Sequence, residues 1–246
     1  MLQVTPNGPF GRERHPALPV LLHEVLHDLG ECVRAGADGV HLHARDAAGA
    51  ESLDPTVVAQ TCAAVREVGR ECGVDLEVGL TTGAWIVPDV TQRVAMVREW
   101  EGVDCATVNV GEPGFETVMA TLVDAGIGVD AGVWAPAEVD ALVASGLLPH
   151  LTRVSVELSP GEPYRLTGDP RQVAADVWQR LDAAGVACAR LTHGDGTFTW
   201  PLVREAFALG HHTRVGFEDS VQLPDGRIAT GNADLVRAAV DLRAAA

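Results

Sequence analysis

Short apolar, β-branched runs alternate along the chain with longer segments in which apolar residues recur with the period of a helix. This alternation predicts a parallel sheet whose strands are joined by crossover helices. We expect eight strands, at residues 2–5, 39–43, 76–80, 106–110, 128–133, 153–157, 187–192 and 213–217. Each unit then has about 31 residues, the length that one strand and one helix need together. The pattern predicts a (β/α)8 TIM barrel, an α/β fold that occupies residues 1–246 as a single domain.

Turn residues mark the expected helix ends. A glycine precedes several expected strands: Gly36, Gly126, Gly146, Gly185 and Gly210. Glycine adopts the left-handed conformation that ends many helices. Asp54-Pro55 and Asp169-Pro170 each place a capping carboxylate before a proline, as at a helix start. No G-x-G-x-x-G follows the first strand, so nothing indicates the dinucleotide site of a doubly wound open sheet.

The composition limits the partners. A net charge of −16 argues against a nucleic acid or an anionic membrane surface, because the long-range field repels phosphates. The five cysteines show no C-x-x-C spacing and lie in apolar segments, as expected of reduced thiols in a cytoplasmic protein. No apolar stretch approaches the length of a membrane span, and the N-terminus lacks the pattern of a signal peptide. We expect a small-molecule partner.

Polar residues collect where the expected strands end, which is where barrels place reactive groups. They are Asn7, His41, His43, Arg45, Thr81, Thr82, Thr107, Asn109, Glu112, Asp130, Glu157, His193, Arg214, Glu218 and Asp219. The positions between them stay apolar, as in strands that face helices. The site is therefore expected at this end of the barrel.

His41-Leu42-His43 is the sharpest local pattern. Strand side chains alternate, so both imidazoles lie on one face, about 7 Å apart along the strand. A pair of hydrogen-bonded core histidines is an equally good interpretation of this pattern alone. Glu218 favours a metal, because two imidazoles and one carboxylate leave a coordination position open, as in catalytic zinc sites. Another divalent ion would also accept these ligands.

The basic and hydroxyl residues are candidates for substrate binding. Arg214 and Arg45 can hold a carboxylate with a bidentate guanidinium, although a structural role is the better interpretation for Arg45. Thr81, Thr107 and Asn109 can donate hydrogen bonds to substrate oxygens, or be satisfied inside the barrel.

The remaining polar residues have two interpretations each. Glu112, Asp130 and Glu157 can position substrate or orient metal ligands, or they form buried ion pairs. His193 is a fourth ligand, an acid or base, or a partner of the loop that follows it. Asp219 adjoins Glu218 but points the opposite way along a strand, so it is either a separate base or a residue that orients a neighbour.

Several stretches together resemble the β-keto acid cleavage enzyme family, best known for cleaving 3-keto-5-aminohexanoate with acetyl-CoA. The matching segments are 7–8, 15–19, 35–46, 80–83, 106–109, 214–220 and 232–236. The most specific are His-x-His-x-Arg at 41–45 and Arg-Val-Gly-Phe-Glu-Asp at 214–219. The resemblance covers nearly the whole chain and points to a shorter branch of the family.

The resemblance implies a zinc-dependent transferase on a barrel, with His41, His43 and Glu218 as ligands. Asp219 would be the base, with Arg214 beside it. Thr81 and Thr107 would contact the carboxylate or keto group of the substrate. The implied reaction joins a β-keto acid to acetyl-CoA and gives acetoacetate and a new CoA thioester. A bound metal would polarise the carbonyl in this exchange. The resemblance also implies a homo-oligomer.

The chain departs from the family at two positions that bind the substrate amine. Phe10 stands where the family has a glutamate, and Gly132 replaces the second glutamate of a P-E-x-E stretch, whose first is represented by Asp130. A substrate with an amino group at that end is not expected unless Asp130 or Glu112 compensates.

Two other functions remain open. One is a metal-dependent hydrolase or lyase that acts on a small keto or carboxylic acid without CoA, with Asp219 or His193 as base. The other is a small-molecule-binding barrel that keeps the metal and has lost the chemistry, which the changes at Phe10 and Gly132 would explain.

Overall fold

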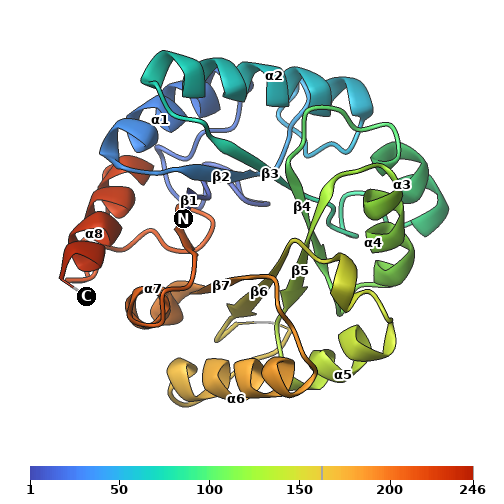
Figure 1. Cartoon of the computed structure of the whole chain (residues 1–246). Helices are drawn as coiled ribbons and strands as arrows, with labels where there is room; N and C mark the ends of the chain where they lie inside the picture. The colour runs from blue at the N-terminus through green and yellow to red at the C-terminus, as the bar shows by residue number, and fades with distance from the viewer. Residues whose placement is uncertain (162, 246) are drawn as a thin grey trace.

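A computed structural model describes residues 1–161 and 163–245. Eight parallel strands form one sheet that curls into a nearly closed barrel, which confirms the predicted fold (Figure 1). The strands are β1 Leu2–Val4, β2 Gly39–Leu42, β3 Glu77–Thr81, β4 Cys105–Asn109, β5 Gly128–Val133, β6 Arg153–Leu158, β7 Ala189–Gly194 and β8 Thr213–Val215. β1 pairs with both β2 and β8, and an isolated bridge between Leu191 and His212 joins β7 to the start of β8.

A helix follows every strand, and the helices surround the sheet in Figure 1. They are α1 Leu22–Ala35, α2 Pro55–Cys72, α3 Val90–Val97, α4 Phe115–Asp124, α5 Pro136–Ala144, α6 Pro170–Ala183, α7 Thr199–Ala208 and α8 Asn232–Ala244, with short 3-10 turns η1 Leu148–His150 and η2 Gly196–Phe198. Asp54 and Asp169 cap α2 and α6 by accepting hydrogen bonds from backbone amides, as predicted. The five glycines expected at helix ends all have positive φ.

Four strands end earlier than predicted. β1, β2 and β4 each end one residue early, at Val4, Leu42 and Asn109, and β8 ends two residues early, at Val215. Beyond the end of β2, hydrogen bonds from the Asn7 side chain take the place of the backbone hydrogen bonds between strands. Its amide donates to the His43 carbonyl at 3.0 Å, and its oxygen accepts from the His43 amide at 3.3 Å. Side-chain hydrogen bonds thus fix the backbone beyond these strands, which strand periodicity could not foresee.

The apolar core lies between the sheet and the helices, while the inside of the barrel carries a polar network. Asp130 accepts from Arg153 Nε at 2.9 Å and from Ser155 Oγ at 2.6 Å, and Arg153 also donates to Glu77 at 2.8 Å. The four side chains satisfy one another, and none lines the pocket described below. They close the barrel interior on the far side of that pocket.

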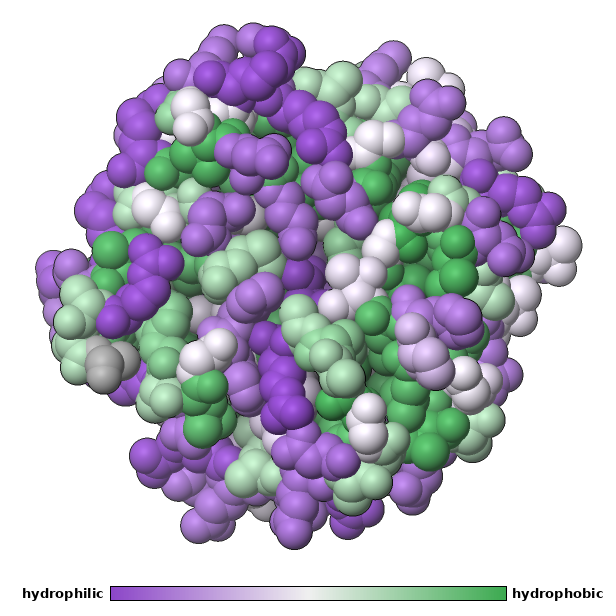
Figure 2. All heavy atoms as spheres, in the orientation of Figure 1, coloured by the Kyte–Doolittle hydropathy of each residue, from purple (hydrophilic) through white to green (hydrophobic). Residues whose placement is uncertain are grey.

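The outer surface carries most of the charge. Figure 2 shows hydrophilic side chains around much of the rim, with hydrophobic ones gathered toward the side where Figure 1 places α3, α4 and α5. Among residues 1–161 and 163–245, no helix has the length and hydropathy that a membrane crossing requires.

Candidate active site

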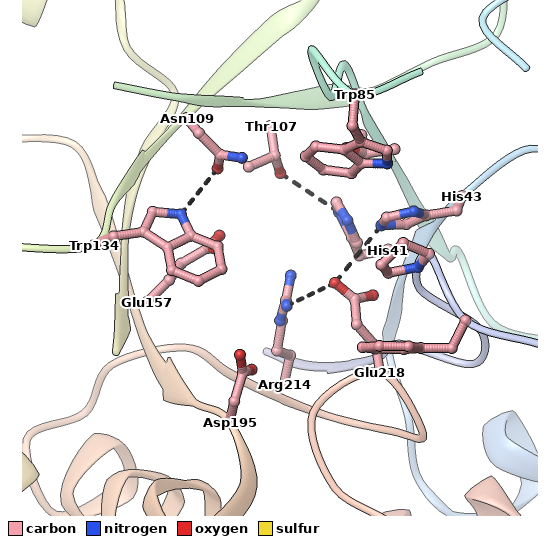
Figure 3. A pocket seen from close by; sticks show the side chains of 13 residues that line it. His41, His43, Trp85, Thr107, Asn109, Trp134, Glu157, Asp195, Arg214 and Glu218 are labelled. Atoms are coloured by element: carbon pink, nitrogen blue, oxygen red, sulfur yellow. Dashed lines mark hydrogen bonds and ion pairs between the residues drawn. The ribbon is translucent and has the colours of Figure 1, made fainter. Parts of the chain in front are cut away.

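A pocket of about 360 Å³ opens at the C-terminal ends of the strands, where the polar residues were expected (Figure 3). Its lining consists of Pro9, Phe10, His41, His43, Thr81, Trp85, Thr107, Asn109, Trp134, Glu157, Asp195, Arg214 and Glu218. Residues from β2, β3, β4, β6 and β8 therefore converge on one space. Eight of the residues proposed from the sequence for metal, substrate or catalysis are among them: His41, His43, Thr81, Thr107, Asn109, Glu157, Arg214 and Glu218.

His41, His43 and Glu218 lie together on one side of the pocket in Figure 3. Each offers a ligand atom, and these three atoms all lie within 4.8 Å of one another. The two imidazoles meet edge to face, with centroids 5.6 Å apart, and His43 Nε2 is 3.6 Å from Glu218 Oε1. Two side chains from the end of β2 and one from the loop after β8 thus surround one point.

The protonation of these groups suits a bound cation. Burial lowers the pKa of His41 to about 3, which keeps its imidazole neutral. Burial also disfavours the charged form of His43, but the carboxylates of Glu218 and Glu51 outweigh it and raise the pKa of His43. Arg214 and His43 hold the pKa of Glu218 well below its usual range despite its burial. The electrostatic potential at the point that His41, His43 and Glu218 surround therefore favours a positive charge.

Glu218 also has a free oxygen. Its Oε1 accepts from Arg214 at 2.9 Å, whereas the buried Oε2 has no hydrogen-bond partner among the described residues. A buried carboxylate oxygen without a donor is costly unless something else binds it. The neutral imidazole of His41 and this oxygen fit a divalent metal.

Glu51 fixes the orientation of His43. Its Oε1 lies 2.6 Å from His43 Nδ1, so the imidazole can donate there and leave Nε2 directed at Glu218. Trp85 donates its indole N–H to the same carboxylate, 3.2 Å from each oxygen, and stacks on the His43 ring at 5.8 Å. The Arg45–Glu51 antiparallel bridge turns the chain back toward β2 and brings Glu51 to this place. Neither Glu51 nor Trp85 was proposed from the sequence.

Gly8 lets Glu218 approach the strand ends. Its φ is +56°, and a Cβ at this position would lie 2.6 Å from the Cγ of Glu218. Any side chain here would be strained and would push the carboxylate away from the histidines.

Arg214 is the charged centre of the site. It donates to Glu218 and Asp219, each at 2.9 Å, and through Nε to His193 Nδ1 at 3.1 Å. Nε2 of His193 lies 3.4 Å from a Glu157 oxygen. In the part of the chain that the structure describes, Nη1 of Arg214 makes no hydrogen bond to the protein. One face of the guanidinium thus remains available to a ligand.

His193, Asp195 and Asp219 form a second group with ligand atoms within 4.8 Å of one another. Arg214 already supplies positive charge to it, because it binds both His193 and Asp219. A metal ion would face that guanidinium at short range, so this group is the less suitable cation site.

Asp195 is a pocket carboxylate that the sequence did not single out. It follows β7 and lines the pocket, and its carboxylate accepts no hydrogen bond from any residue in 1–161 or 163–245. Burial, reinforced by the negative charge of Asp219, raises the pKa of Asp195 to about 7. Its position after the glycine that ends β7 gave no signal of function.

The side of the pocket opposite His41, His43 and Glu218 is formed by Asn109, Trp134 and Glu157 (Figure 3). The Trp134 indole donates to Asn109 Oδ1 at 3.1 Å. A Cβ at Gly132 would lie 2.5 Å from that oxygen and 3.4 Å from a Glu157 oxygen. The glycine noted as a departure from the family therefore makes room for Asn109, and Glu157 reaches into the same region.

Three residues proposed from the sequence for substrate binding lie outside the pocket lining. Arg45 donates to the carbonyls of Gly8, Phe10 and Gly49, and so holds the loop after β1. Glu112 accepts from the Ala84 amide and from Arg93. Asp130 belongs to the interior network with Arg153. The structure uses all three to support the backbone around the site.

Comparison with known proteins relates the whole chain to one family. The sequence profile of the beta-keto acid cleavage enzyme matches residues 1–246. The chain is 26% identical over 237 residues to a 3-keto-5-aminohexanoate cleavage enzyme of Fusobacterium nucleatum subsp. nucleatum, and 22% identical over 242 residues to one of Acetoanaerobium sticklandii. Each alignment covers 94% of this chain and 86% of the relative.

Solved structures with the same architecture support the fold alone. The apo structure of ObcA superposes with a TM-score of 0.66 at 18% identity, over 92% of this chain and 61% of that one. A rubisco-like protein, MtnW, from Alicyclobacillus acidocaldarius subsp. acidocaldarius gives 0.63 at 16% identity, over 100% of this chain and 60% of that one. The chain spans about three fifths of the length of these two proteins.

Proposed function

We propose that this chain, which belongs to the beta-keto acid cleavage enzyme family over its whole length, joins a β-keto acid to acetyl-CoA and releases acetoacetate and a new CoA thioester. The observation that carries the proposal is the cluster of His41, His43 and Glu218 beside Arg214 in the pocket. The two curated relatives are named for cleavage of a β-keto acid. We infer the same class of reaction here.

We propose one divalent metal, zinc, held by His41, His43 and Glu218. When bound there, it would supply Lewis-acid polarisation of the substrate carbonyl oxygens. Nη1 of Arg214 faces the same space and would donate to the carboxylate or to the oxygen on which negative charge develops. Thr81 and Thr107, which line the pocket from β3 and β4, would position the substrate oxygens.

The composition supports activation by a metal and an arginine. All 18 basic residues in the Lys+Arg count are arginines, so these 246 residues contain no lysine. A keto group therefore cannot be activated as a lysine Schiff base. The carbonyl must be polarised by a cation or by hydrogen-bond donors, which is what the pocket places around it.

The lining favours a β-keto acid whose side chain is apolar. Pro9, Phe10, Trp85 and Trp134 supply much of the wall. Phe10 offers no carboxylate where the family has one, and Arg14 lies over its ring at 4.0 Å. A cationic group would meet the Arg14 charge near this wall, whereas an alkyl or aromatic side chain would bury its surface against the rings.

The function is tested by incubating purified protein with acetyl-CoA and a panel of β-keto acids that differ in side-chain charge and size. We expect acetoacetate and a new acyl-CoA in equal amounts, with apolar side chains preferred. Consumption of neither reactant by zinc-loaded protein would reject the proposal. Turnover that does not depend on CoA would indicate a metal-dependent hydrolase or lyase, and tight binding without turnover would indicate a binding protein. We also propose a cytoplasmic homo-oligomer.

Glu51→Gln is expected to weaken zinc binding by about 10- to 100-fold, the usual effect of losing a carboxylate that orients a ligand histidine. The amide cannot accept the proton of His43 Nδ1 as strongly, so the ring loses its fixed orientation. Competition with a chelator measures the zinc Kd. The matched control is Glu71→Gln, at an exposed position near the end of α2. Equal zinc affinity in wild type and Glu51→Gln would contradict this role.

Gly8→Ala is expected to lower zinc affinity strongly, because the new methyl group would occupy the space of the Glu218 side chain. Gly226→Ala is the matched control, since Gly226 also has positive φ (+84°) but nothing lies within 4 Å of its added Cβ. Both variants pay the backbone strain, about 1 kcal/mol or more. Only Gly8→Ala should lose zinc in the chelator assay, and an equal loss in both would contradict the contact.

A further inference from the structure

Strand β6 carries three polar side chains in alternation on one face: Arg153, Ser155 and Glu157. The first two belong to the network around Asp130, which satisfies them. Glu157 lies nearer the C-terminal end of the strand, where it lines the pocket and is 4% exposed. No residue within 1–161 or 163–245 donates a hydrogen bond to its carboxylate. The strand thus presents to the pocket a buried acid that the protein leaves without a donor.

His193 is the neighbour of Glu157 on the adjacent strand, but it does not satisfy the carboxylate. The two residues are register partners on β6 and β7, and His193 Nε2 lies 3.4 Å from Glu157 Oε1. This contact is not aligned as a hydrogen bond, since the buried Nε2 has no partner in the described part of the chain. On its other side the ring is held by Nε of Arg214 at 3.1 Å. His193 therefore cannot turn toward the carboxylate without losing its bond to Arg214.

The other polar groups on this wall of the pocket are already engaged. Asn109 Oδ1 accepts from the Trp134 indole at 3.1 Å, and its amide nitrogen donates to Glu112 at 2.9 Å. Gly132 contributes no side chain, and a Cβ there would lie 3.4 Å from Glu157 Oε1. The glycine therefore keeps the approach to the carboxylate open. Glu157 is the acceptor on this wall that still lacks a donor.

The chemistry of the missing partner follows from that of a carboxylate. An ionised carboxylate only accepts hydrogen bonds, and a buried one without a donor is costly, so its complement is a donor on the ligand. A neutral hydroxyl suits this place better than an ammonium group. Arg214, one imidazole away through His193, already supplies positive charge behind Glu157. What the carboxylate lacks is a hydrogen bond.

We propose that Glu157 is a specificity-determining residue, which accepts a hydrogen bond from a hydroxyl group on the side chain of the substrate. The inference rests on the proposed β-keto acid reaction and narrows its substrate to a small, uncharged hydroxy-β-keto acid. Glu157 lies across the pocket from His41 and His43 (Figure 3), so the hydroxyl belongs on the carbon chain beyond the keto group. The rings of Phe10 and Trp134 cover the carbons between.

The test compares acids that differ in one group: 3-ketohexanoate, 5-hydroxy-3-ketohexanoate and 3-keto-5-aminohexanoate, with isomers that carry the hydroxyl on the neighbouring carbons. Calorimetry measures their binding to zinc-loaded protein without acetyl-CoA, and acetoacetate formation gives kcat/KM. Wild type should prefer one hydroxy acid over 3-ketohexanoate by about 10- to 100-fold, the effect of a hydrogen bond to a charged acceptor. No preference for any hydroxy acid, or a preference for the amino acid, would overturn the inference.

Two substitutions show whether the preference comes from Glu157. Glu157→Leu should reduce it to about one-fold, because leucine accepts no hydrogen bond. Glu157→Gln should keep part of it, since an amide oxygen still accepts from a hydroxyl. A carboxylate with only a structural role would instead change the affinities for the hydroxy acid and 3-ketohexanoate equally. Glu71→Leu, at an exposed position on α2, is the matched control and should retain the wild-type preference. Zinc content and thermal unfolding show that each variant is folded.

Binding and turnover separate this inference from the proposed function. Acetoacetate formation with no preference that depends on Glu157 would reject the role of Glu157 and leave the reaction standing. A Glu157-dependent preference for a hydroxy acid in calorimetry, with no acetoacetate formed, would reject the proposed reaction and support the hydroxyl subsite for a ligand of another reaction.

Discussion

Glu218→Ala is expected to remove the metal from the purified protein and to abolish acetoacetate formation. Glu218 supplies the only carboxylate of the His41, His43 and Glu218 group, and its Oε2 is the buried oxygen without a donor. Two imidazoles alone make a weak and poorly charge-balanced zinc site. Metal analysis should show zinc falling from about one per chain to near zero. His43→Ala should have the same effect, because it removes the ligand that Glu51 orients.

The controls for this loss are Glu71→Ala and His23→Ala, two exposed positions on α2 and α1. Both should retain wild-type zinc. Thermal unfolding of metal-free samples shows whether the site variants still fold; we expect folding, since Arg214 keeps Asp219 as a partner when Glu218 is lost. Near-stoichiometric zinc in both Glu218→Ala and His43→Ala would exclude the proposed site and turn attention to His193, Asp195 and Asp219.

The barrel could be predicted because its signals are local. Each signal involves residues only a few positions apart in the sequence. This holds for the alternation of apolar residues, for helix periodicity, for the caps at Asp54 and Asp169 and for glycines such as Gly36. The clustering of the proposed metal ligands could be predicted for a related reason. The parity of His41 and His43 follows from β2, and Glu218 lies just beyond a strand that must end at the same side of the barrel.

The parity argument fails where a strand ends early. Arg45 has the parity of His43, but β2 stops at Leu42, and the chain then turns so that Arg45 binds backbone carbonyls outside the pocket. β8 likewise stops at Val215, so the direction of Asp219 is set by Thr5 and Arg214 and not by strand alternation.

Other site residues depend on contacts between segments far apart in the chain. Glu51 reaches His43 through a turn and an antiparallel bridge, and Trp134 reaches the pocket by binding Asn109 of the neighbouring strand. Asp195 and Asp219 both follow strands and look alike in sequence. Only their packing around Arg214 shows that one faces the pocket and the other faces away.

Arg214→Met is expected to abolish turnover and to destabilise the metal-free protein by about 3–5 kcal/mol, the usual cost of removing one partner from a buried ion pair. The guanidinium is the donor that Glu218 and Asp219 share, and methionine of similar length would leave both carboxylates buried without it. Urea unfolding gives the free energy of unfolding. Arg214→Lys should also fail in catalysis, because one ammonium group cannot reproduce three hydrogen bonds in a planar arrangement.

Zinc binding and a second substitution distinguish how much Glu218 and Asp219 each contribute to this loss of stability. Saturating zinc should recover part of the stability of Arg214→Met, because it neutralises Glu218, and adding Asp219→Asn should recover a further part by removing the other unpaired charge. Neither should restore turnover, since both leave the pocket without its donor. Arg227→Met, which breaks only an exposed pair with Asp225, should leave the urea midpoint close to that of wild type. If Arg214→Met unfolded at the same urea concentration as Arg227→Met, the three buried charges would not depend on one another.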